Sequence, residues 1–164
     1  MGYSLYKNGE PIVIVNGKEE FFPVKKLTET AIIPTKGSRE AAGFDLYADN
    51  EDVIVIEPHD TLLIGTGIAA AVPSGYVGLL FARSGLATKR ALRPANCVGV
   101  IDADYRGEIK VALHNDSDIQ QFIEPHERIA QLSLIPYLTI NIKEVSELDE
   151  TERGMGGFGS TGRT

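Results

Sequence analysis

The chain has 164 residues, 43% apolar and 24% charged, and a formal net charge of −7 at pH 7. This length favours one domain with a hydrophobic core of its own. The acidic balance argues against broad binding to nucleic acid, which needs a basic face, although local arginines can still hold a small polyanion. No apolar run approaches the roughly 18 residues that span a bilayer, so we expect no membrane association.

The single cysteine and the three histidines suggest neither a disulfide nor a zinc site. Cys97 stands in the apolar context NCVGVI, and we expect it to be small and buried rather than a reactive thiol. His59, His114 and His126 are far apart, and we expect them in solvated turns or on strand faces. The N-terminus lacks the basic-then-apolar pattern of a signal peptide. Together these features predict an intracellular location, in the cytoplasm, the nucleus or a host cell.

Short apolar segments separated by turn residues run through most of the chain and predict strands. The predicted strands are Val53–Glu57, Ile68–Val72, Tyr76–Phe81, Val98–Asp102, Glu108–Asn115, Arg128–Pro136 and Ile140–Val145. Glu108–Asn115 alternates between aliphatic and other residues, as a half-buried strand does. Val53–Ile56 is apolar throughout, as for a strand buried on both faces. Ser84–Leu92 is the single helix-friendly stretch. Many short strands at roughly regular spacing favour a sandwich or barrel.

Both ends of the chain differ from the middle. In residues 1–22, Asn8-Gly9 and Asn16-Gly17 bracket the apolar run PIVIV, which predicts a small hairpin-like extension. Five of the last eleven residues are glycine, which predicts a flexible terminus. We therefore divide the chain into an extension (1–22), a β domain (23–148) and a Gly-rich C-terminal arm (149–164).

Two stretches in the first half place polar residues beside apolar strands. AAGFDLYA sets Asp45 among apolar residues, where it serves either a site or a turn whose backbone N–H it caps. ARSGLA follows an apolar strand and offers Arg83 and Ser84, which suit a phosphate. The alternative for ARSGLA is a plain helix N-cap with a surface arginine.

Three stretches follow in the second half. In NCVGVIDADYRG, Asp102 ends an apolar strand and is either a general base or a strand-ending turn acid. In RIAQLSL, Gln131 sits inside an apolar strand and needs partners, in a site or from a neighbouring loop. RGMGGFGSTG puts an arginine, an aromatic residue and two hydroxyls on a glycine frame, which alone also fits a disordered tail.

Taken together, AGFDL, RSGLA, GVIDADYRG, RIAQL and RGMGGFGSTG resemble, in order and spacing, the five motifs of the trimeric dUTPase family, from about Val24 to Thr164. The resemblance implies an all-β fold, a jelly roll or β-clip barrel with one short helix and a flexible C-terminal arm. It also implies a homotrimer whose active sites are shared between subunits. The closing GGFGSTGRT is close to a phosphate-binding loop, but no helix follows it; the resemblance makes it a lid.

The implied reaction is hydrolysis of dUTP to dUMP and pyrophosphate. By resemblance, Asp102 activates the water that attacks the α-phosphorus, and Arg153 neutralises charge on the phosphates. Asn96 and the main chain at Val98 and Gly99 read uracil. The ring of Tyr105 packs on the deoxyribose and leaves no room for a 2′-hydroxyl.

The phosphate contacts implied by the resemblance come from two segments. The β domain supplies Arg83, Ser84, Gly85 and Gln131, and the arm supplies Ser160 and Thr161, which hold the γ-phosphate. In the same part of the arm, Phe158 stacks over uracil and Gly159 is a further substrate-binding residue. Mg²⁺ is expected on phosphate oxygens and waters, with Asp45 associated only indirectly. Ala82 stands where the family often has proline, so the backbone entering the phosphate turn is less pre-set.

Two alternatives stay open at this point. A dCTP deaminase shares the fold, but its added acid-base residue after the third motif is missing from this sequence. A regulatory binding protein on the same scaffold is the second alternative, motivated by residues 1–22, which no motif explains.

Overall fold

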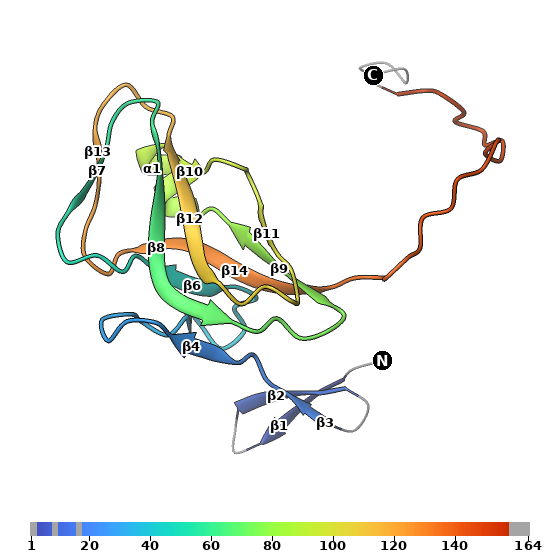
Figure 1. The fold of residues 1–164 in the computed structure, drawn as a ribbon, viewed down its shortest axis with the longest axis horizontal. Helices are drawn as coiled ribbons and strands as arrows, with labels where there is room; N and C mark the ends of the chain where they lie inside the picture. The colour runs from blue at the N-terminus through green and yellow to red at the C-terminus, as the bar shows by residue number, and fades with distance from the viewer. Residues whose placement is uncertain (1–2, 8–9, 16–17, 158–164) are drawn as a thin grey trace.

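The computed structural model describes residues 3–7, 10–15 and 18–157 (Figure 1). Its strands are β1 (Tyr3–Lys7), β2 (Glu10–Val15), β3 (Lys18–Glu20), β4 (Val24–Lys26), β5 (Thr35–Lys36), β6 (Phe44–Tyr47), β7 (Ile54–Ile56), β8 (Thr61–Ala70), β9 (Tyr76–Phe81), β10 (Leu92–Pro94), β11 (Gly99–Ile101), β12 (Glu108–Asn115), β13 (Gln121–Ile123) and β14 (Arg128–Pro136). One helix, α1 (Ser84–Arg90), joins β9 to β10. No helix in the described ranges is long and apolar enough to cross a membrane.

Two antiparallel sheets carry the body of the molecule. One has the order β10-β12-β8-β4 and the other the order β11-β9-β14-β6-β5. Aliphatic residues from both sheets form a common core, and β12 contacts β14 across it. Strand β12 shows why: Ile109, Val111 and Leu113 are buried, while the residues between them face outward. Burial of each such side chain stabilises the fold by about 2 kcal/mol.

Three predicted strands are confirmed with their bounds: Tyr76–Phe81, Glu108–Asn115 and Arg128–Pro136. The prediction for Ile68–Val72 is wrong at both ends, because β8 begins at Thr61 and stops at Ala70. Glycines at 65 and 67 interrupt the apolar pattern of this strand, so the pattern did not predict the part before Ile68.

The predicted strand Ile140–Val145 is absent, and the segment after β14 is an exposed coil that leads away from both sheets (Figure 1). Ile140 is 74% exposed and Ile142 fully exposed. Leu138, Ile140 and Ile142 alternate as a strand would, but no strand in the described ranges pairs with them.

The prediction that Val53–Ile56 is buried on both faces is also wrong. Strand β7 pairs only with β13, in a two-stranded sheet. Ile56 is buried in the core, whereas Val53 and Val55 are 46% and 41% exposed. One face of this small sheet is therefore covered and the other is open.

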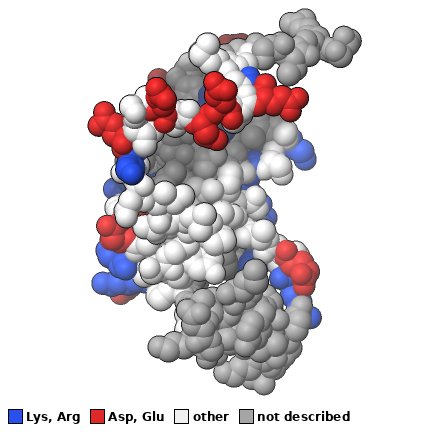
Figure 2. Space-filling model, turned by 90° about the vertical axis from the view of Figure 1, so that its right-hand side faces the viewer, with Lys and Arg blue, Asp and Glu red and all other residues white. Residues whose placement is uncertain are grey.

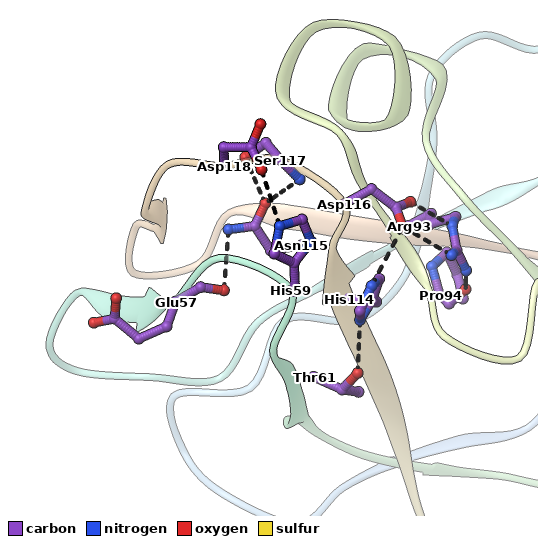
Figure 3. Close-up of polar contacts among 10 residues, drawn as sticks. All are labelled: Glu57, His59, Thr61, Arg93, Pro94, His114, Asn115, Asp116, Ser117 and Asp118. Atoms are coloured by element: carbon purple, nitrogen blue, oxygen red, sulfur yellow. Dashed lines mark hydrogen bonds and ion pairs between the residues drawn. The ribbon is translucent and has the colours of Figure 1, made fainter.

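A buried amide organises the turn after β12 (Figure 3). Asn115 Nδ2 donates to the carbonyls of Ile56, Glu57 and Ile119 at 3.1, 3.1 and 2.8 Å. Asn115 Oδ1 accepts from the backbone N–H and the hydroxyl of Ser117. Because Asn115 is fully buried, these bonds satisfy polar groups that water cannot reach.

Beside this turn, a row of polar side chains crosses three strands (Figure 3). His114 pairs in register with Thr61 on one side and Arg93 on the other. Asp116 accepts from Arg93 Nε and Nη2 at 2.5 and 2.9 Å, and these bonds hold the pKa of the Asp116 carboxyl below its usual value. As expected, His114 lies on a strand face, and His59 and His126 lie in turns with positive φ.

The N-terminal segment forms a sheet of its own, with the order β1-β2-β3. Figure 1 draws it below β4, at the edge of the molecule. The division of the chain at residues 22 and 148 stays a prediction.

Candidate active site

The predicted phosphate-binding residues meet at a buried carboxylate. Gln131 on β14 pairs in register with Asp45 on β6 and with Phe81 at the end of β9. Arg83, two residues beyond Phe81, donates from Nε to Asp45 Oδ1 at 3.0 Å, and Gln131 Nε2 lies 3.4 Å from the same oxygen. Arg128 donates from Nη1 to Asp45 Oδ2 at 3.1 Å.

Asp45 is 2% exposed, so its charge is balanced by two guanidinium groups rather than by water. Both of its oxygens accept hydrogen bonds, which makes Asp45 a support for Arg83 and Gln131 rather than an open metal ligand. Sequence reasoning missed Arg128. Its signal was its place as the first residue of RIAQL, at the start of strand β14 and directly before two buried residues.

Ser84 and Gly85 begin α1, directly after Arg83. Arg83 takes the N-cap position with an extended backbone, and no side chain caps the helix. Ser84 accepts from Thr88 Oγ1 at 2.7 Å through its carbonyl, while its side chain is at the surface. The alternative of a plain N-cap with a surface arginine is therefore wrong, because Arg83 is held by Asp45.

The predicted uracil-reading residues form an exposed turn between β10 and β11. Val98 N–H donates to Asn96 O at 2.6 Å across Cys97, which has φ +61°. The expectation that Cys97 is buried is wrong, since it is exposed at the tip of this turn. A Cβ on Gly99 would lie 3.1 Å from Leu80 Cβ and 3.5 Å from Asn96 Nδ2, so the Asn96 amide lies close above the Gly99 backbone.

Asp102 and Tyr105 frame the next turn, which Tyr105 N–H closes onto Asp102 O at 3.2 Å. Both side chains are exposed. Asp102 opens into a cavity of about 640 Å³ at the end of the five-stranded sheet. Its lining residues are Tyr76, Val77, Asp102, Ala103, Asp104 and Tyr137.

One chain does not bring Asp102 and the phosphate-binding group together. Ile101, next to Asp102, pairs with Gly78 in the first half of β9, whereas Arg83 follows the far end of that strand. The five residues from Gly78 to Arg83 span roughly 17 Å when extended. Asp45 lies on β6, three strands across the sheet from β11, which adds roughly 14 Å sideways.

The arm holds the remaining predicted residues. Arg153 is exposed and donates from Nε to Gly156 O at 2.8 Å, within its own turn. Phe158, Gly159, Ser160 and Thr161 lie outside the described residues. Within the described part of the chain, no group of three or more His, Cys, Asp or Glu side chains could hold a metal ion.

Charge on the face in Figure 2 follows the acidic composition. Acidic side chains gather at one end, uncharged residues cover the middle, and basic residues stay near the edges. This face offers no continuous basic surface of the kind that nucleic acid requires.

Comparison with known proteins decides the family. Residues 29–162 match the family model described as dUTPase. The chain is 51% identical over 140 residues to the deoxyuridine 5′-triphosphate nucleotidohydrolase of Nautilia profundicola, covering 85% of this chain and 97% of the relative. The chain belongs to the dUTPase family. All five sequence motifs begin within the matched range, whereas residues 1–22 lie outside it.

Solved dUTPases have the same fold. A mutant of the dUTPase of Staphylococcus bacteriophage 80alpha, bound to dUpNHpp, superposes with a TM-score of 0.79 at 32% identity, over 87% of this chain and 98% of that one. A mutant dUTPase from phage phi11 of S. aureus superposes with a TM-score of 0.70 at 28% identity, over 78% and 98%, and is described with a structural Mg(II) ion. The predicted all-β jelly roll with one short helix is therefore confirmed.

Proposed function

We propose that this dUTPase-family chain is a dUTP diphosphatase, which hydrolyses dUTP to dUMP and pyrophosphate. The observation that carries the proposal is the 51% identity to a deoxyuridine 5′-triphosphate nucleotidohydrolase over 140 residues. The convergence of Arg83 and Gln131 on Asp45 supports it, because these motif residues are far apart in sequence and meet where a phosphate site is expected.

In the proposed reaction, Asp102 takes the proton of a water molecule that attacks the α-phosphorus. The new P–O bond forms as the bond from the α-phosphorus to the bridging oxygen breaks, and pyrophosphate leaves. The exposed position of Asp102 at the mouth of a cavity supports this role, since water and nucleotide can both reach it. Arg153 then neutralises the charge on the departing phosphates.

Arg83, Ser84, Gly85 and Gln131 hold the phosphates. The Asp45 carboxylate fixes the direction of the Arg83 guanidinium, so little reorganisation is needed when the nucleotide binds. Arg128, on the other oxygen of Asp45, leaves this cluster with a net positive charge. A positive cluster of this kind can attract a triphosphate to an acidic protein.

Mg²⁺ fits this arrangement as an ion bound to the triphosphate. Magnesium prefers phosphate oxygens and waters to an all-protein cage, and it would neutralise charge on the phosphates. Asp45 contributes indirectly, through the residues that position those phosphates, because its own oxygens are occupied by Arg83, Gln131 and Arg128.

The working enzyme is proposed to be a homotrimer with shared active sites. The separation between Asp102 and the Asp45 cluster supports this, because a site that uses both can take them from different subunits. The exposed, alternating residues Leu138, Ile140 and Ile142 support it as well, since they suit contact with another subunit. The arm of one subunit then places Phe158, Gly159, Ser160 and Thr161 over a site made by the others.

Base and sugar selection are assigned to the loop from Asn96 to Tyr105. The Asn96 amide offers both a donor and an acceptor to the imide edge of uracil, with backbone groups at Val98 and Gly99 beside it. The Tyr105 ring packs on the deoxyribose and excludes a 2′-hydroxyl.

A substrate panel tests this assignment. The purified full chain with Mg²⁺ is given dUTP, UTP, dCTP and dTTP, and the products are separated by chromatography. Formation of dUMP and pyrophosphate from dUTP alone is the expected result. Release of dUTP or dUMP from dCTP would instead identify a deaminase-type enzyme on the same fold.

A regulatory binding role is the second candidate, because the sheet β1-β2-β3 lies outside the family match. It predicts that a pull-down with the full chain recovers a protein that a chain lacking residues 1–22 does not. Identical recoveries would remove it. The intracellular location stays a prediction.

A further inference from the structure

Tyr105 bends back across the turn that it ends. Its hydroxyl donates to the carbonyl of Glu108 at 2.9 Å, three residues further along the chain. Between the two lies Gly107. A Cβ built on Gly107 would lie no farther than 3.0 Å from Oη, Cζ and Cε2 of Tyr105, closer than real Cβ atoms come to their neighbours. The ring thus occupies the space that a side chain at 107 would need.

The backbone does not require glycine at this position. The described glycines with positive φ are Gly67, Gly75 and Gly154, so Gly107 has a conformation open to other residues. Glycine is needed at position 107 only because the Tyr105 ring fills the space that a side chain there would take. At Gly37, by contrast, an added Cβ would meet nothing within 4 Å.

The loop backbone around Tyr105 is tied down on both sides. Arg106 Nη1 donates to the carbonyls of Ala103 and Tyr105 at 2.7 and 2.8 Å, and Tyr105 N–H donates to Asp102 O. An added methyl group at 107 therefore meets a braced backbone, and the Tyr105 ring is the part that can move.

We infer that Gly107 is a specificity-determining position: it leaves room for the Tyr105 ring, and so sets how closely that ring approaches the sugar. This inference rests on the proposed function, in which Tyr105 excludes the 2′-hydroxyl. Gly107 is a positioning residue, because it acts on the substrate only through Tyr105. A displaced ring leaves space beside the 2′ carbon of the sugar, where a hydroxyl can then fit. The ratio of kcat/KM for dUTP to kcat/KM for UTP falls as a result.

The test compares kcat/KM for dUTP and UTP in the wild type, Gly107→Ala, Tyr105→Ala and the double variant. Gly107→Ala is expected to lower the dUTP-to-UTP ratio about tenfold, the scale of losing one close contact. In the Tyr105→Ala background, Gly107→Ala is expected to change the ratio no further, since the ring it displaces is gone. Gly37→Ala is the matched control and should keep the wild-type ratio.

An unchanged ratio in Gly107→Ala, or an equal drop with and without Tyr105, would overturn the inference. If Gly107→Ala does not fold, the double variant decides, because Tyr105→Ala frees the space beside position 107. Recovery of the folded state in the double variant supports the inference, and failure to fold in both backgrounds contradicts it. If the wild type itself hydrolyses no dUTP, the proposed function fails, which is a different result from these.

Discussion

Arg83 and Asp45, 38 residues apart in the chain, form an ion pair of 3.0 Å in which the Asp45 side chain is 3% exposed. The pair joins the first motif to the second, and Arg128 and Gln131 attach the fourth motif to the same carboxylate. The residues proposed to bind phosphate are thus braced by contacts within the sheet.

Asp45→Asn removes the charge that both guanidinium groups face. Because the group is buried, we expect a loss of about 3 kcal/mol in the free energy of unfolding, measured by denaturant titration. Arg83 also loses its fixed direction, so kcat/KM for dUTP should fall up to about 100-fold. Asp118→Asn, whose side chain is 97% exposed, is the control and should change neither quantity. Wild-type kinetics in Asp45→Asn would contradict the bracing role.

Asp102→Asn keeps the shape of the side chain but removes its ability to accept a proton. We expect kcat to fall about 10³-fold, because general-base catalysis contributes on this scale. The dissociation constant for dUTP, measured by calorimetry, should stay near the wild-type value. Equal losses in binding and turnover would show that Asp102 holds the nucleotide rather than activating water.

Asn115→Ala tests the turn at the end of β12. It removes the amide that bonds the carbonyls of Ile56, Glu57 and Ile119 and that accepts from Ser117, so we expect a loss of about 3 kcal/mol in the free energy of unfolding. The kcat of the folded enzyme should not change, because this turn holds none of the predicted site residues. Asn141→Ala, in the exposed coil after β14, is the control and should be neutral.

Asp116→Asn tests a pH-dependent contribution to stability. Hydrogen bonds from Arg93 lower the pKa of Asp116 in the folded chain from its ordinary value of 3.8, with His114 and His59 adding to the effect. A lowered folded-state pKa contributes stability that is present above 3.8 and is lost as the pH falls through the folded-state value.

The wild type should therefore be more stable than Asp116→Asn at pH 7, by a small amount because the pair is open to solvent. The difference should close as the pH falls below 3.8. A difference that stays constant with pH in thermal unfolding would show that the charge of Asp116 is not its source.

Apolar or alternating strands bounded by turn residues were predictable from sequence, and β9, β12 and β14 match their expected bounds. The five motifs also predicted the family, and they singled out Asp45, Arg83 and Gln131, although not that Arg83 and Gln131 meet at Asp45. What sequence could not supply were contacts made across distance, such as Asn115 to Ile56 or Arg128 to Asp45. At Ile140–Val145 the alternating pattern predicted a strand that is absent from the structure. A strand also needs a neighbouring strand to bond with, and the sequence pattern does not show one.

The role of Gly107 was hidden for a similar reason. A glycine after an arginine is typical of a turn. The sequence does not show that the Tyr105 ring lies against this glycine, which the structure does. Cys97 was misjudged because its apolar neighbours belong to the start of β11, whereas Cys97 itself lies in the turn before that strand.

The most direct test of the account is complementation between inactive chains. Arg83→Ala and Asp102→Asn are each expected to be inactive toward dUTP. They are unfolded together, mixed in equal amounts and refolded. If a site takes Asp102 from one chain and Arg83 from the next, random assortment gives about a quarter of the sites both intact residues, and about a quarter of wild-type activity returns. If both residues serve a site from the same chain, no site in the mixture is intact. A mixture as inactive as its components would therefore contradict a dUTPase whose active sites are shared between subunits.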